Sequence, residues 1–240
     1  MDDYLYGADT YSQSDLFAGI PRERQADIFG RGRHRLVASG GTLFRESGQA
    51  LIGYFVEKGR LKLSKVHEEG KEAIIRYINP GEITAAVAVF SGKSYPVTAV
   101  AVGPTEVIGW NREAILDLMS DQSPLAINLL HVVVQRLDDI QNRYLEQRAE
   151  RVEQRIGRAL LRLVKHSGRK MNDRILIDFP LSRQDLADYS GSTLYTVSRV
   201  LSSWEKRGWI KSGRERIAVT DTKSLQAFAE RGPSPELLEL

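Results

Sequence analysis

Residues 181–207 read LSRQDLADYSGSTLYTVSRVLSSWEKR, and this stretch decides the fold of the C-terminal third of the chain. Ser182 can cap a short helix over residues 183–189, because a serine hydroxyl accepts a hydrogen bond from an unpaired N–H at a helix start. Gly191 can adopt the positive φ that a tight turn requires, and Thr193 can cap a second, longer helix. Two helices joined by a glycine turn, with apolar residues facing each other, predict a helix-turn-helix.

Two short apolar segments follow this pair of helices. Trp209-Ile210 and Ile217-Ala218-Val219 flank the polar turn Ser212-Gly213-Arg214. This arrangement predicts a two-stranded wing with a basic tip. A plain helical hairpin is the alternative interpretation, but it would not explain the polar start of the second helix.

The second helix carries the residues that would read DNA. A recognition helix presents its N-terminal residues to base edges in the major groove, and Leu194, Tyr195, Ser198 and Arg199 project from its first two turns. Arg199 is the predicted bidentate donor to guanine O6 and N7, Ser198 can read a base edge, and Tyr195 can contact a thymine methyl group or a phosphate. The predicted phosphate contacts are Ser182, Arg183, Gln184, Thr193, Thr196, Gly213 and Arg214.

Charge is distributed unevenly along the chain. Residues 148–223 hold 17 Lys and Arg against 9 Asp and Glu, a net charge of +8, whereas the remainder holds 17 against 22, a net charge of −5. A basic C-terminal third beside an acidic body favours a nucleic-acid-binding module attached to a sensing or assembly module.

The segment from Arg33 to Trp110 has mostly the period-two pattern of β-strands. The strands expected there are residues 51–56, 60–66, 73–78 and 97–102, with a hairpin turn at residues 67–71. Glycines recur about every ten residues between them, which is typical of a small antiparallel barrel or sandwich.

A long helix is expected between the two modules. Asn111 can cap a short helix over 112–119, and a longer one should run from Pro124 to about Gln147, followed by a polar hinge at 146–151 and a helix at 152–165. Residues spaced 3, 4, 3 and 4 apart predict a dimerisation seam, unless the helix packs only on its own barrel. The seam residues are Leu130, Val133, Leu137, Ile140 and Tyr144.

Composition excludes several classes of protein. With no cysteine, the chain cannot hold disulfides, cysteine zinc sites or cysteine-ligated iron–sulfur clusters. Its four histidines do not have the spacing of a metal site, and the apolar run at 83–90 is far shorter than the ~20 residues of a membrane span. The acidic, polar start is unlike a signal peptide, so a cytoplasmic protein without a membrane partner is expected.

We therefore expect an α+β protein of three parts. Residues 1–120 form a β-roll sensor domain with an N-terminal arm over the first ~20 residues, 121–150 the dimerisation helix and hinge, and 151–240 a winged helix-turn-helix with a frayed tail.

The chain resembles the CRP/FNR superfamily of transcription regulators. LSRQDLAD, TVSRVLSSWEKRGWI and GRERI resemble its DNA-binding domain, whereas NPGE at 79–82 and the EEGKE hairpin resemble its cyclic-nucleotide-binding-like β-roll. The resemblance implies a homodimeric regulator, not an enzyme, that binds roughly palindromic double-stranded DNA and contacts RNA polymerase. It also implies that Arg199 reads guanine, and TLYTVSR resembles the NnrR-like subgroup, which responds to nitrogen oxides. Tyr195 stands where most members have a glutamate, which leaves the half-site sequence open.

The same resemblance limits the effector. Members that bind cyclic nucleotides have a glutamate and an Arg-Ser pair where this chain has Ala86 and Tyr95-Pro96, so cAMP is not expected. Haem stays open: Val87 stands where carbon-monoxide sensors have a histidine, and His131 is the candidate axial ligand, or else a hydrogen-bonded helix residue. The predicted pocket would suit haem, a small apolar effector or no ligand. Its residues are Val87, Tyr95, Val97, Val134 and Ile140.

The sequence is compatible with three functions. The leading one is a DNA-binding regulator whose β-roll senses an effector or gas, such as nitric oxide through haem, with a ligand-free or small-molecule-responsive regulator as its variant. A cupin-like barrel enzyme is the second, although neither paired histidines nor paired carboxylates mark the strands. A β-roll scaffold that binds a protein partner is the third.

Overall fold

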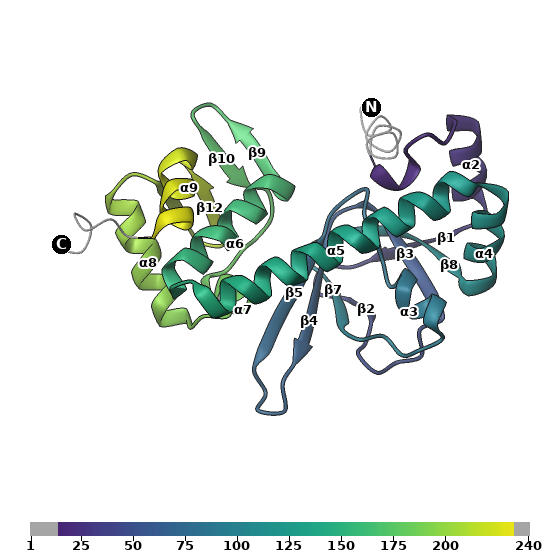
Figure 1. Ribbon diagram of the computed structural model, residues 1–240, viewed down its shortest axis with the longest axis horizontal. Coiled ribbons are helices and arrows are strands. Elements are labelled where there is room, and N and C mark those ends of the chain that lie inside the picture. Colours follow the sequence, from purple (N-terminus) through teal and green to yellow (C-terminus); the bar gives the residue numbers. More distant parts are fainter. Residues whose placement is uncertain (1–13, 233–240) are drawn as a thin grey trace. The chain divides into compact units, whose positions relative to one another are not determined.

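The computed structural model describes residues 14–232, which fall into two compact units (Figure 1). The N-terminal unit comprises the residues up to Gly70 together with 75–139, and the C-terminal unit comprises 71–74 together with the residues from Ile140 onward. The expected tail from residue 233, and residues 1–13 of the expected arm, lie outside the described residues. The rest of that arm is part of the core, because the short helix η1 (Asp15–Phe17) buries Leu16 and Phe17.

The N-terminal unit is built on two four-stranded sheets. The first has the order β1-β8-β3-β6 and the second β2-β7-β4-β5. Their bounds are β1 (Arg33–Val37), β2 (Thr42–Phe44), β3 (Ile52–Lys58), β4 (Leu61–Val66), β5 (Glu72–Ile78), β6 (Ile83–Thr84), β7 (Thr98–Ala101) and β8 (Thr105–Asn111).

The four strands expected from the sequence are β3, β4, β5 and β7, each within two residues of its expected ends. β1 was not expected from the sequence. Four of its five residues are exposed, so its sequence lacks the alternation of apolar and polar residues that indicates a strand. It is held instead by antiparallel pairing with β8, which also pairs with β3.

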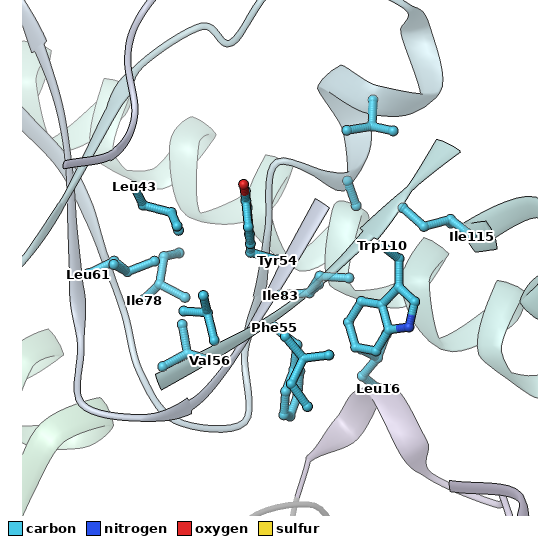
Figure 2. Close-up of a cluster of buried hydrophobic side chains, with 14 of the residues drawn as sticks. Leu16, Leu43, Tyr54, Phe55, Val56, Leu61, Ile78, Ile83, Trp110 and Ile115 are labelled. Atoms are coloured by element: carbon cyan, nitrogen blue, oxygen red, sulfur yellow. The ribbon is translucent and has the colours of Figure 1, made fainter. Parts of the chain in front are cut away.

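The core of this unit centres on β3, which is buried on both faces (Figure 2). Phe55 and Val56 are fully buried although they point to opposite sides of the strand. The Phe17 ring centroid lies 5.3 Å from that of Phe55 in an edge-to-face arrangement. The Trp110 indole Nε1 donates to the Ile28 carbonyl at 3.0 Å, so its buried N–H is paired. Helix α2 (Arg22–Gly30) is thereby fixed to β8.

Helices α3 (Ala86–Ser91), α4 (Arg112–Asp121) and α5 (Ser123–Ala149) complete the sequence of elements up to the C-terminal unit. The cap at Asn111 is confirmed, because its Oδ1 accepts from the Ala114 N–H at 2.8 Å. The long helix is confirmed too, but it continues through most of the polar segment that was expected to be a hinge. Only Glu150 and Arg151 separate it from the next helix. Two ion pairs connect this region to that helix, Glu146 with Arg162 at 2.6 Å and Glu150 with Arg158 at 2.7 Å.

The C-terminal unit packs helices against a sheet of order β11-β12-β10-β9. Its elements after α5 are α6 (Val152–Ser167), β9 (Gly168–Met171), β10 (Arg174–Ile177), α7 (Arg183–Ser190), α8 (Leu194–Lys206), β11 (Ile210–Gly213), β12 (Arg216–Val219) and α9 (Thr222–Arg231). β9 and α9 were not expected. Helix α9 closes the core, where the Phe228 ring meets Trp204 edge-to-face with centroids 5.6 Å apart.

Gly59, in the turn between β3 and β4, provides a test of how closely this turn approaches Pro104 and Thr105. Its φ is +80°, and an added Cβ would lie 2.4 Å from the Pro104 carbonyl oxygen. Gly70 has a similar φ of +78° but nothing within 4 Å of the added Cβ. Gly70→Ala should cost only the left-handed backbone strain, about 1–2 kcal/mol. Gly59→Ala should cost at least about 2 kcal/mol more. Thermal midpoints from calorimetry would measure both, and equal shifts would contradict the close contact at Gly59.

Candidate nucleic-acid interface

The helix-turn-helix expected from the sequence is present as α7, a glycine turn and α8. Ser182 Oγ accepts from the Asp185 N–H at 2.9 Å, and Asp185 Oδ2 accepts from the Ser182 N–H at 3.3 Å, which completes a reciprocal cap. Gly191 ends α7 with φ +63° and ψ +45°. Thr193 Oγ1 then accepts from the Thr196 N–H at 3.2 Å and starts α8.

Apolar contacts fix the angle between the two helices. Leu186 and Ala187 of α7 and Val197 and Leu201 of α8 are fully buried. Trp204 lies one turn further along α8 and extends the core toward α9. These residues share one side of α8, so the other side, with Tyr195 and Arg199, faces outward.

Arginines hold the turn between the helices. Arg155 of α6 donates to the Gly191 carbonyl at 3.1 Å, and Arg143 of α5 donates to the Tyr189 carbonyl at 2.8 Å. The Arg143 guanidinium also lies 4.7 Å from the centroid of the Tyr189 ring. Cations therefore meet the carbonyls at the C-terminal end of α7, where the helix dipole is negative. No local sequence pattern predicts this support, because the residues lie far apart along the chain.

Two of the three predicted base-reading residues are exposed. Tyr195 is 79% exposed, the highest value among the large hydrophobic residues of 14–232, and the Arg199 side chain is 64% exposed. Ser198 is half-buried beside them. Arg199 Nη2 lies 3.3 Å from Glu153 Oε1 at the start of α6. In the free chain, the guanidinium that is expected to contact guanine is therefore paired with a carboxylate.

Most of the predicted phosphate contacts make hydrogen bonds within the chain. Ser182 and Thr193 use their hydroxyls as helix caps, and Gln184 Nε2 donates to Asp188 Oδ1 at 2.8 Å. Thr196 Oγ1 lies 2.9 Å from that of Thr193. Gly213 and Arg214 are exposed at the tip of the wing, between β11 and β12.

A polar contact that the sequence did not reveal fixes the wing to α8. Glu205 Oε1 accepts from the Ser212 N–H at 2.7 Å and from the Ser212 hydroxyl at 2.6 Å. Arg183, a predicted phosphate contact, donates to the same hydroxyl at 3.3 Å. The hydrogen bonds from Ser212, together with the positive charge of Arg183, lower the pKa of Glu205 below its usual value. The wing and both helices therefore form one polar network.

The seam residues of α5 are mostly exposed in the single chain. Leu130, Leu137, Ile140 and Tyr144 are each more than half exposed, and Val133 is half-buried. On the same helix Val132 packs against the core of the N-terminal unit. The helix therefore contacts the N-terminal unit through the side that carries Val132 and leaves an apolar stripe uncovered.

The five residues of the expected effector pocket do not share one buried environment. Val87, Val134 and Ile140 are exposed, and Val97 is half-buried. Tyr95 is buried, with its ring 4.2 Å from that of Phe44 and its hydroxyl donating to the Ile52 carbonyl at 3.0 Å. Tyr95 therefore has its own structural contacts within the β-roll.

A half-buried cation, Arg136, also belongs to the N-terminal unit. Arg136 of α5 donates from Nη2 to the Ile83 carbonyl, while its Nε has no partner among the described residues. Burial and, to a smaller extent, the charge of Arg76 lower the pKa of Arg136 to about 10. Arg76 itself pairs with Glu82 at 3.2 Å.

All four histidines are exposed, including His131. His34 Nδ1 lies 3.0 Å from Glu57 Oε2, and burial raises the pKa of Glu57. Within residues 14–232 no three histidine, aspartate or glutamate side chains gather as a metal ion would require. Over the same residues, none of the helices combines the length and the apolar character needed to cross a bilayer.

Comparisons with known proteins match both units. Residues 34–122 match the cyclic nucleotide-binding domain family, and residues 154–228 match the Crp-like helix-turn-helix domain family. The chain is 22% identical to a CRP-like cAMP-activated global transcriptional regulator of Mycobacterium tuberculosis, over 94% of this chain and 98% of that protein. It is 26% identical to the nitrogen fixation regulation protein FixK of Azorhizobium caulinodans, over 89% and 87% of the two chains.

A solved structure shares the fold. FixK2 from Bradyrhizobium japonicum superposes with a TM-score of 0.72 at 23% sequence identity, over 82% of this chain and 96% of that one. The likeness confirms the expected α+β architecture of a cyclic-nucleotide-binding-like domain followed by a helix-turn-helix domain.

The contact between Glu205 and Ser212 gives a prediction for pH. The folded pKa of Glu205 is lowered, so its charge stabilises the fold above the unfolded pKa of about 4.5 and ceases to do so as pH falls through the folded value. Glu205→Gln should therefore lower the thermal midpoint of the C-terminal unit at pH 7. The difference from wild type should shrink as pH falls below about 4.5 and through the lowered folded pKa. A difference that did not shrink as the carboxyl became protonated would contradict an ionised Glu205 in this contact.

Proposed function

Because the chain belongs to the CRP/FNR family of transcription regulators, we propose that it works as a homodimer that binds a roughly palindromic DNA site. Two recognition helices would enter successive major grooves about 34 Å apart, one from each subunit. The N-terminal unit would sense an effector, and RNA polymerase would be the protein partner at the promoter.

One observation carries the DNA-reading part of this proposal. Arg199 is exposed on the outward side of a capped helix whose inward side is fully buried. A guanidinium presents two parallel N–H donors, which match O6 and N7 of guanine. Its ion pair with Glu153 is exposed, and such pairs contribute at most about 1 kcal/mol, so guanine can displace the carboxylate.

The exposed stripe on α5 supports dimerisation. Its residues are apolar at a and d spacing over two heptads, and they would remain in water if the chain stayed alone. A second copy of the same helix offers the same stripe, so a two-fold arrangement would cover both. The symmetry of the dimer would then match that of a palindromic site.

For the effector we propose only a chemical class. The Mycobacterium relative is named as cAMP-activated, but this chain has Ala86 and Tyr95-Pro96 where the resemblance predicts the glutamate and the Arg-Ser pair. Tyr95 is also buried in contacts of its own. We therefore propose a regulator that either responds to a small molecule other than a cyclic nucleotide or needs no ligand.

Gas sensing through haem is the competing form of the proposal. The described histidines are exposed, so the single chain encloses no histidine that could serve as an axial ligand. His131 could act only if a bound haem or a second subunit covered it. An absorption spectrum after reconstitution with haem separates the two forms: a Soret band lost in His131→Ala would favour the gas sensor, and its absence would favour the small-molecule or ligand-free regulator.

Arg199 and Arg214 should differ in what they contribute to DNA binding. Arg199→Ala should remove the preference at one base pair of each half-site, a discrimination of about 1–3 kcal/mol. Arg214→Ala should weaken binding to all sequences alike and reduce the slope of log K against log salt by about 1. Titrations of wild type and both variants with matched and single-mismatch duplexes at several salt concentrations would measure this. A base preference that survived in Arg199→Ala would contradict its role.

The seam can be tested with two leucines of the same helix. Leu137→Glu places a charge in the proposed contact between two copies, so sedimentation equilibrium should show a mass near the 27.0 kDa of one chain. Leu145 is also exposed but lies outside the a and d positions, so Leu145→Glu should stay dimeric. A dimeric Leu137→Glu would argue against the seam.

A further inference from the structure

The first turn of α8 carries an exposed apolar pair. Leu194 and Tyr195 are its first two residues, 47% and 79% exposed, on a surface whose other exposed members are polar or charged. Val197, Val200 and Leu201 of the same helix are buried in the core. The pair is therefore not part of the fold's own packing.

A DNA surface offers few groups that such a pair can contact. Leucine has neither a donor nor an acceptor, so it cannot replace the hydrogen bonds that base edges make with water. At the edges of the base pairs in the major groove, the apolar group is the C5-methyl of thymine. An exposed leucine at the start of a recognition helix therefore matches thymine better than any other base.

Helix geometry places this contact relative to Arg199. Tyr195 precedes Arg199 by four residues and Leu194 precedes Ser198 by four, so each apolar residue lies one turn before a polar one on the same side of the helix. One turn advances 5.4 Å along the axis, against about 3.4 Å between base pairs. The apolar pair would thus reach one or two base pairs from the guanine.

We propose that Leu194 and Tyr195 read thymine methyl groups within about two base pairs of the guanine that Arg199 contacts. The inference rests on the proposed function and deepens it, because it names the base that the departure at Tyr195 left open. The resulting half-site carries thymine within about two base pairs of the guanine. A 5-methylcytosine at the same position supplies the same methyl group and replaces thymine in the contact.

Replacement of thymine by deoxyuridine tests the proposal, because it removes the methyl group and leaves the pairing unchanged. A site is first selected from random duplexes with the full-length protein. Each thymine near the guanine is then replaced in one half-site. At one or two positions we expect affinity to fall about fourfold, the factor that corresponds to burying one methyl group.

Variants assign this loss to the two side chains. In Leu194→Ala or Tyr195→Ala the deoxyuridine penalty should fall to less than about twofold at the position that the residue contacts. Leu194→Met keeps an apolar side chain of similar volume and should keep the penalty. Leu36→Ala makes the same truncation at an exposed leucine of the N-terminal unit and should also keep it. Circular dichroism melting curves would show that each variant folds.

The outcomes distinguish failure of the methyl contact from failure of the proposed DNA-binding function. If no site were selected and binding were independent of sequence, the proposed function would fail. If a site were selected but deoxyuridine bound as well as thymine, only the methyl contact would be overturned. A penalty that persisted in both alanine variants would also overturn it, because another group would then read the thymine.

Discussion

The left-handed turn at Gly191 is the constraint on which the DNA-reading surface depends. Its φ of +63° ends α7 and lets α8 leave in a direction that its apolar side can bury. A residue with a Cβ would pay about 1–2 kcal/mol to adopt this conformation. Arg155 and Arg143 then donate to the carbonyls of Gly191 and Tyr189 at the end of this helix. The position of Tyr195 and Arg199 follows from this turn.

The same contacts explain why the boundary between the units lies inside α5. Arg143 belongs to the long helix, yet it donates to Tyr189 beside the turn, and Glu146 pairs with Arg162 of α6. The last turns of α5 are thus held to the body that carries the recognition helix, and the C-terminal unit begins at Ile140. A change in how the seam residues Ile140 and Tyr144 pair would act on that body directly.

Local patterns predicted the elements that bury one side and expose the other. The helix-turn-helix, the long helix and the cap at Asn111 follow from spacing, glycine and capping chemistry, which act over a few residues. The missed elements depend on partners distant in sequence: β1 exposes most of its residues and is held by β8. The contact of Glu205 with Ser212 depends on where the wing folds back, which no local pattern encodes.

The structure also changes which groups are expected to contact phosphate and which are expected to contact bases. Hydroxyls expected to bind phosphate are used by Ser182 and Thr193 to cap helices, so near these residues the phosphate backbone would meet helix N-termini and nearby cations rather than free serine or threonine side chains. Arg183, another predicted phosphate contact, donates to Ser212 of the wing. In the proposed function, sequence discrimination would then rest on a short set of exposed residues at the start of α8. In the proposed homodimer these few reading groups would be used twice, once on each half of a palindromic site, and this repetition would raise specificity.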